Sequence, residues 1–298
     1  MLKNKYLNTP WLSLCLTILL AGALTSCSND DVTSDTIFID EDESQMNAFD
    51  RWKYQNYTLP YNIKLMYKME DIESDYSYTL APADYHKSVK LAHIVKYAWL
   101  EAYDEVAGIN FTRKYVPKIL HFIGSPAYEQ NGTMVLGTAE GGLKVTLYMV
   151  NSLKIDESYL NTYYFHTMHH EFSHILHQTK NYDPSYDLIS EADYVGGDWY
   201  LYDAGTALQK GFISQYARSE AREDIAEMTA TYICKSEEAW NALIAGAGDE
   251  GAAIINRKLA IVKKYMQDSW GIDMDRLRYS VQSRMHHIVN GDIDLDSL

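Results

Sequence analysis

Apolar and polar positions along the chain follow two different periods, which separate a first part containing strands from a later part made of helices. Alternating residues rich in Tyr and Ile predict a strand within 59–70. Apolar runs divided by "NG" and "GG" turns predict more strands within 118–125 and 133–151. Apolar residues at helical spacing predict helices at 86–108, 161–179, 222–235, 253–268 and 273–287. We therefore expect an α+β fold, with a small β-rich N-terminal lobe and a helical C-terminal half.

The first 48 residues lie outside this pattern. Lys3 and Lys5 precede the apolar run Trp11–Leu24, which is too short to span a bilayer and is typical of a signal peptide. The run ends in "LTSC", which resembles the bacterial lipobox, where the cysteine is diacylated and becomes the first mature residue. We predict a lipoprotein signal peptide at 1–26, a lipid anchor at Cys27, an acidic flexible tether at 27–48 and one folded domain at 49–298.

The segment "SNDD", Ser28–Asp31, indicates where the anchored protein lies. It resembles the acidic tag of surface-exposed lipoproteins in Bacteroides-type bacteria, and the alternative is an ordinary polar tether. We therefore expect an outer membrane lipoprotein exposed on the cell surface, with a periplasm-facing location as the alternative.

Charge and cysteine content exclude some classes of function. Removal of residues 1–26 takes two lysines and no acid, which leaves 24 basic and 41 acidic residues and a net charge of −17. Such a surface repels nucleic acid and anionic membranes, so we exclude nucleic acid as a partner. Cys234 is the one cysteine left besides Cys27, which predicts no internal disulfide and a small core side chain at 234.

The helix predicted at 161–179 carries the residues with the most specific chemistry. His170-Glu171-Phe172-Ser173-His174 matches H-E-x-x-H, in which residues i and i+4 share one helix face and both imidazoles can bind one zinc ion, with Glu171 as the base. His169 points about 100° away from His170 and is not expected to bind metal. His166 and His177 lie one turn to either side, as supporting or cleft-lining residues at most.

A zinc hydrolase needs a third protein ligand, and this helix does not supply it. The pattern H-E-x-x-H-x-x-G-x-x-H fails, because His177 and Lys180 occupy its glycine and final histidine positions. The helix at 222–235 offers Glu223 and Glu227 on one face, beside the small residues Ala226 and Ala230. We predict Glu223 as the ligand and Glu227 as a partner that orients a ligand histidine, as in gluzincins. A solvated acidic face is the alternative, and Glu220 and Asp224 are weaker candidates on other faces.

The two motifs together resemble a known family. "HHEFSHILHQ" followed by "YARSEAREDIAE" is similar to the zinc metallopeptidase family of Bacteroidetes lipoproteins, described as substrate-import-associated zinc metallohydrolases, and the likeness covers most of residues 50–280. It implies a zincin-like fold with the zinc site between the two halves, and a link to a TonB-dependent, SusC/SusD-type importer complex. The second motif is also similar to the catalytic region of anthrax lethal factor, which implies Glu223 as a zinc ligand and Tyr216 as a catalytic phenol.

The sequence thus favours a zinc-dependent peptidase of the cell envelope, with a peptide or glycopeptide as substrate and Zn²⁺ as cofactor. Gly137–Gly142 is a candidate rim of the substrate cleft or a plain hairpin turn, and Asn181–Lys210 is expected to form a wall of the cleft. Two other functions remain open. One is a surface ligand-binding lipoprotein with a structural or vestigial zinc site, and the other is a zinc hydrolase acting on a non-peptide amide.

Overall fold

The computed structural model describes residues 45–69, 77–128, 134–135, 137–140 and 143–298. The lipobox, Cys27 and the tether up to residue 44 lie outside the described residues. Asn47–Leu298 form one compact unit. None of the described helices is long and apolar enough to cross a membrane.

A four-stranded sheet has the strand order β1-β2-β6-β5. β1 (Lys64–Met66), β2 (Ile119–Phe122) and β6 (Lys144–Leu147) run parallel, and β5 (Gly137–Glu140) is the antiparallel edge strand. A separate pair joins β3 (Ala127–Tyr128) to β4 (Met134–Val135). Leu120, Phe122, Val145 and Leu147 are fully buried, as expected for strands covered by helices.

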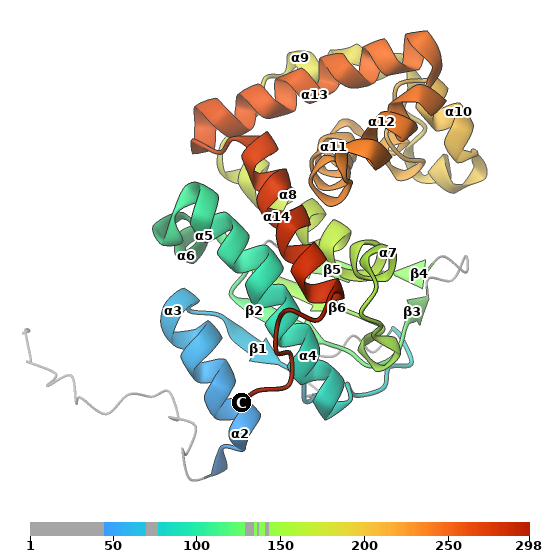
Figure 1. The fold of residues 1–298 in the computed structure, drawn as a ribbon. Helices are drawn as coiled ribbons and strands as arrows, with labels where there is room; N and C mark the ends of the chain where they lie inside the picture. Colours follow the sequence, from blue (N-terminus) through green and yellow to red (C-terminus); the bar gives the residue numbers. More distant parts are fainter. Residues whose placement is uncertain (1–44, 70–76, 129–133, 136, 141–142) are drawn as a thin grey trace, which may run out of the picture. The chain divides into compact units, whose positions relative to one another are not determined.

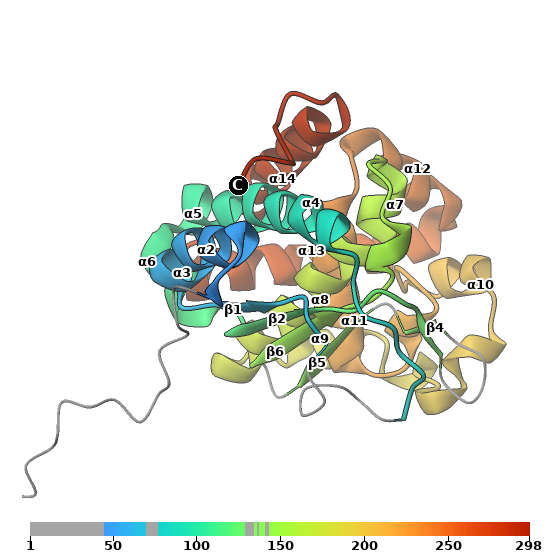
Figure 2. The same cartoon turned by 90° about the horizontal axis from the view of Figure 1, so that it is seen from below.

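Helices supply most of the N-terminal half as well. They are α2 (Ala48–Lys53), α3 (Leu59–Tyr61), α4 (Tyr85–Val95), α5 (Glu101–Ala107) and α6 (Ile109–Tyr115). A π-helical turn, Lys96–Leu100, joins α4 to α5, which confirms the helix predicted at 86–108. Another, Tyr54–Thr58, joins α2 to α3. Figure 2 shows α2, α3 and α4 on the same side of the sheet.

Two predictions for this half differ from the structure. Of the described residues 59–69, only Lys64–Met66 form a strand, because Pro60 suits the first turn of a helix and Asn62, at φ 56°, ends that helix in the left-handed region. The N-terminal lobe is also not β-rich, because the helices listed above contain more residues than its short strands. The prediction of a mixed helix-and-sheet fold is confirmed in that coarse form, with helices in the majority.

The later helices agree with the periodicity of the sequence. α7 (Glu157–Leu160), the π-helical turn Asn161–Phe165 and α8 (His166–Thr179) follow one another without a break. α11 (Ala221–Cys234), α13 (Gly248–Trp270) and α14 (Met274–Val289) confirm the other three predicted helices. Shorter helices between them are α9 (Ser185–Ile189), α10 (Ala204–Gln209) and α12 (Glu237–Gly246). The 3₁₀ turns are Val150–Ser152, Glu191–Asp193, Gly196–Leu201 and Tyr216–Arg218.

The packing of α8 against α11 organises the centre of the fold. The apolar stripe of the α8 segment, with Phe165, Met168, Phe172 and Leu176, is buried in the main core, where the Phe172 ring lies 4.9 Å from that of Tyr103. The opposite face of α8 carries His170 and His174 toward α11. There Ala226 and Ala230 are fully buried and allow the two helices to approach closely.

Candidate metal centre

The atoms that could bind a metal ion come from two helices. α8 supplies Nε2 of His170 and Nε2 of His174 from consecutive turns of one face. α11 begins at Ala221 and places Glu223 in its first turn, where a carboxylate also interacts favourably with the helix dipole. His170, His174 and Glu223 thereby form a group that could hold a metal ion.

The separations within this group fit zinc. Nε2 of His170 lies 3.0 Å from Nε2 of His174 and 3.0 Å from Oε2 of Glu223, and Nε2 of His174 lies 3.3 Å from the same oxygen. Ligand atoms about 2.0–2.1 Å from a tetrahedral zinc ion lie roughly 3.3 Å apart, close to these values. Two imidazole nitrogens and one carboxylate oxygen are also a donor set that zinc accepts.

Hydrogen bonds on the far side of each imidazole set its tautomer. Nδ1 of His170 lies 2.8 Å from Oε1 of Glu227, whose pKa is held well below its usual range by His166 and His170 in spite of burial. An ionised carboxylate only accepts, so this nitrogen carries the proton. Nδ1 of His174 lies 2.8 Å from Nε2 of His177, and burial lowers the pKa of His177 to about 4, so His177 is neutral and can accept.

The three facing atoms are suited to hold a cation between them. With both Nδ1 atoms protonated, the two Nε2 atoms and Glu223 present only lone pairs to one another. Burial opposes charging of His170, yet Glu223 and Glu227 raise the pKa of His170 to about 10. A divalent cation bound between these atoms would displace a proton held by His170.

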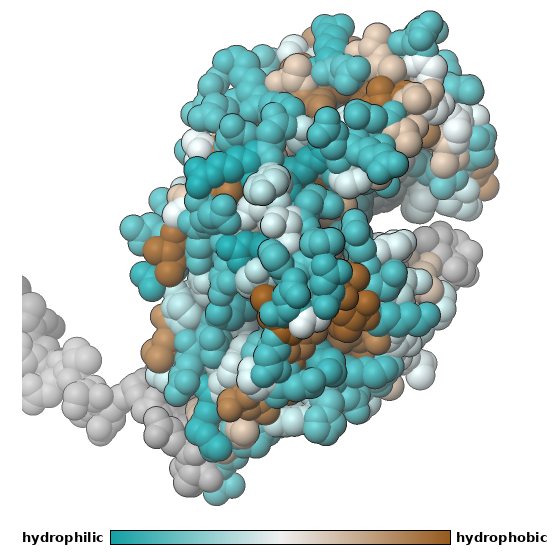
Figure 3. All heavy atoms as spheres, viewed as in Figure 1, coloured by the Kyte–Doolittle hydropathy of each residue, from teal (hydrophilic) through white to brown (hydrophobic). Residues whose placement is uncertain are grey.

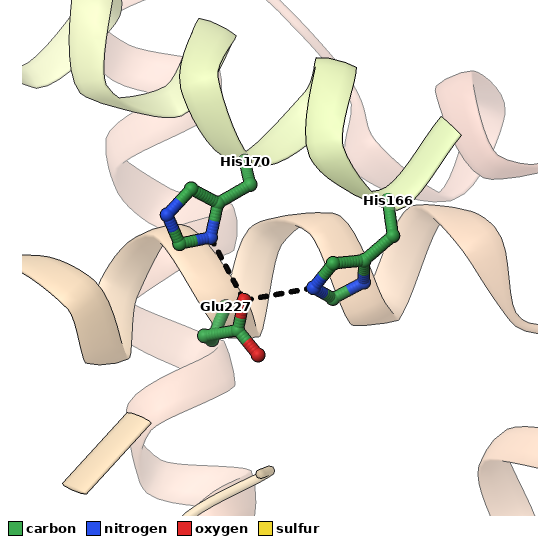
Figure 4. A group of neighbouring side chains, drawn as sticks. All are labelled: His166, His170 and Glu227. Atoms are coloured by element: carbon green, nitrogen blue, oxygen red, sulfur yellow. Dashed lines mark hydrogen bonds and ion pairs between the residues drawn. The ribbon is translucent and has the colours of Figure 1, made fainter. Parts of the chain in front are cut away.

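A second group, His166, His170 and Glu227, lies directly beside the first (Figure 4). Oε1 of Glu227 accepts hydrogen bonds from Nε2 of His166, at 2.7 Å, and from Nδ1 of His170. Its other oxygen, Oε2, accepts a hydrogen bond from the Ser214 hydroxyl at 2.6 Å. Because Glu227 is already fully hydrogen-bonded, this group resembles a network that orients His170 more than a second open metal site. The orienting role of Glu227 stays a prediction, and this contact is the one through which it would act.

Glu171 and Tyr216 lie next to the same cluster. Burial raises the pKa of Glu171, while the neighbouring His170 and His174 lower it and Glu223 raises it. The Tyr216 ring lies 5.8 Å from the His170 ring, and burial together with the charge of Glu223 raises the pKa of Tyr216, so the phenol keeps its proton. Trp199, from the segment predicted to wall the cleft, packs edge-on against Tyr216 at 5.1 Å.

The other candidates lie away from the metal centre. His169 is fully buried, hydrogen-bonds the Tyr103 hydroxyl at 3.0 Å, and has its pKa lowered to about 3 by burial, so it is a neutral core residue. Asp224 is buried on another face of α11 in an ion pair with Lys258, and Glu220 is the exposed residue before the helix. Cys234 is a free, buried thiol in the core, as predicted.

Sequence reasoning did not identify two residues that bind carboxylates of α11. Ser214 binds Glu227 from a loop, and Lys258 binds Asp224 from α13, 34 positions later in the chain. Neither residue belongs to a periodic motif that would have revealed it. The structure does bring together His170, His174, Glu223, Glu227, His177, Glu171 and Tyr216, the residues predicted for the site.

Comparison with known proteins places the chain in a family. The family described as "Putative zinc-binding metallo-peptidase" matches residues 42–275. The chain belongs to this family. A crystal structure of a protein from Bacteroides caccae ATCC 43185, which bears the same description, shares 49% sequence identity, covers 88% of this chain and 99% of its own, and superposes with a TM-score of 0.76. No curated protein matches the chain.

Zinc binding by alanine variants distinguishes the two groups. We expect one zinc ion per chain by elemental analysis, lost in His174→Ala and in Glu223→Ala, because each variant removes an atom of the first group. His166→Ala should keep stoichiometric zinc with affinity lowered by roughly 10–100-fold at most, since it removes only a partner of Glu227. The reverse pattern, with zinc kept in His174→Ala and lost in His166→Ala, would assign the metal to the second group.

Proposed function

We propose that the protein is a zinc-dependent peptidase of the cell envelope, with a gluzincin-like site on a zincin-like scaffold. His170, His174 and Glu223 are the proposed ligands. The convergence of their three atoms beside Glu171, a carboxylate whose pKa is raised by burial, carries the proposal. Membership of a family described as zinc-binding metallo-peptidases supports it.

Zinc held by these residues would lower the pKa of a water molecule and polarise the scissile carbonyl group. Glu171 accepts a proton from the attacking water and delivers it to the leaving amine, a role favoured by a pKa above the usual range of a carboxyl group. Tyr216, protonated and adjacent to His170, donates a hydrogen bond to the former carbonyl oxygen, which becomes an oxyanion when water adds to the carbonyl carbon.

The edge strand β5 offers a place for the substrate backbone. It pairs with β6 on one side and, among the described residues, has no strand on the other. β5 also lies against α8, the helix that carries His170 and His174. An extended peptide can add to such an edge through main-chain hydrogen bonds, which would bring its backbone alongside the proposed zinc ligands.

Replacement of Glu171 separates metal binding from catalysis. Glu171→Gln removes the base and leaves the three proposed ligands, so we expect unchanged zinc content and a loss of peptide hydrolysis of roughly 10²–10⁴-fold. Zinc-loaded protein is assayed against a peptide library, with product peptides identified by mass spectrometry and a chelator-treated sample as reference. Glu220→Gln, an exposed neighbour outside the cluster, is the control. Full activity in Glu171→Gln contradicts the mechanism, and zinc binding without any cleavage favours the ligand-binding alternative.

Tyr216→Phe tests the oxyanion contact. It keeps the ring against Trp199 and His170 and removes only the hydroxyl, so we expect kcat to fall about 10²-fold with little change in KM. Tyr279→Phe is the matched control, because Tyr279 is exposed on α14. An equal loss in both variants, or a rise in KM with kcat unchanged, would exclude a role for the Tyr216 hydroxyl in the transition state.

We also propose that Cys27 anchors the protein to the outer membrane, with its folded domain at the cell surface near a TonB-dependent importer. The lipobox and the acidic segment after it support this location. In a bacterial host, metabolic labelling with palmitate should mark the wild type and not Cys27→Ser, and protease added to intact cells should remove the wild-type protein. Labelling of Cys27→Ser would refute the anchor, and protection from protease would indicate a periplasm-facing location.

A further inference from the structure

A pocket of about 800 Å³ lies next to the candidate metal centre. It is bounded by α7 and the start of α8 on one side and by α10, α11 and α12 on the other. The surface in Figure 3 is hollowed in this region, at the right of the view, between α10 above and α7 below. Its volume falls within the range of roughly 300–1,000 Å³ that small-ligand sites occupy.

The inner wall of the pocket is part of the network around His170. His166 and Glu227 line the pocket, and Oε1 of Glu227 lies 2.8 Å from Nδ1 of His170. The Glu227 carboxylate and the His170 ring therefore lie between the pocket and Nε2 of His170, the atom proposed to bind zinc.

The pocket has aliphatic walls and an acidic rim. Leu208, Ile213 and Leu243 give it aliphatic walls that suit methylene groups. Asp156 and Glu157, both exposed, contribute carboxylates at the rim, against a single ammonium group from Lys235. Among the described residues, Glu157 has no ion-pair partner, so its charge is free to meet a ligand.

We propose that this pocket binds a long, positively charged side chain, lysine or arginine, next to the scissile bond of the substrate. The aliphatic stem lies along Leu208, Ile213 and Leu243, and the cationic end reaches the carboxylates of Asp156 and Glu157. This inference rests on the proposed peptidase function and specifies the substrate class of the same site.

Matched peptides test the preference. Peptides that differ only in one residue, lysine, norleucine or glutamate, are titrated against zinc-loaded Glu171→Gln protein, and binding is followed by fluorescence anisotropy. We expect the lysine peptide to bind roughly fivefold more tightly than the norleucine peptide, with the glutamate peptide weakest. Equal binding of all three, or a preference for glutamate, would overturn the proposal.

Two variants locate the preference in this pocket. Glu157→Lys should abolish the advantage of lysine over norleucine, while Glu237→Lys should not, because Glu237 begins α12 outside the pocket lining. Ala239→Trp should fill the pocket and weaken binding of the lysine peptide by roughly tenfold or more. Ala245→Trp, exposed on the same helix and outside the lining, controls for the added bulk. If both members of a pair behave alike, the lysine residue binds elsewhere.

Zinc content and hydrolysis, measured separately, distinguish failure of the pocket from failure of the proposed function. Ala239→Trp and Glu157→Lys should retain stoichiometric zinc, since neither touches the proposed ligands. If wild-type protein cleaves peptides without favouring lysine or arginine beside the cleaved bond, the pocket proposal fails and the peptidase proposal stands. If the lysine peptide binds in the pocket and no peptide is cleaved, the peptidase proposal fails and the pocket remains a binding site.

Discussion

The close packing of α8 on α11 is the constraint on which the rest of the site depends. Ala226 and Ala230 let the two helices approach, and the helical repeat then brings Glu223 and Glu227, one turn apart, against His170. Buried carboxylates are costly unless they are paired and hydrogen-bonded. Here Glu223 faces two imidazoles, while Glu227 has two imidazoles and the Ser214 hydroxyl. The same contacts that make this burial tolerable also orient the atoms proposed to bind metal.

On the opposite side of α11, Asp224 is held by the Lys258 ammonium group and the Tyr194 hydroxyl. Nζ of Lys258, fully buried in α13, donates to Oδ2 of Asp224 at 2.6 Å and to the carbonyl oxygen of Gly211 at 2.9 Å. A buried ion pair adds little net stability, but it favours one rotational setting of a helix over others. Asp224 follows Glu223 directly, and Gly211 begins the loop that carries Ser214. One side chain thus fixes both the helix and the loop that contribute to the centre.

The parts of the site that could be predicted from the sequence are those set by local periodicity. His170, Glu171 and His174 follow from i, i+4 spacing, and Glu223 and Glu227 from the same spacing beside small residues. Ser214 and Lys258 could not be predicted, because only tertiary packing brings them to α11. The strand expected across 59–70 is shorter than predicted, at Lys64–Met66, for a local reason: Pro60 favours a short helix at the start of the segment. The pocket depends on five separate segments and leaves no pattern in any one of them.

Glu227 lies between the pocket and the His170 ring, and its hydrogen bonds determine where charge selectivity can arise. Its two oxygens already accept from His166, His170 and Ser214, so a cationic ligand gains little by approaching them. Displacing any of these donors would also disturb the orientation of His170. The rim is different, because Asp156 commits one oxygen to the backbone of Tyr159 and Glu157 is free of ion pairs within the described chain. Charge recognition therefore belongs at the rim, where it can vary without altering the centre behind it.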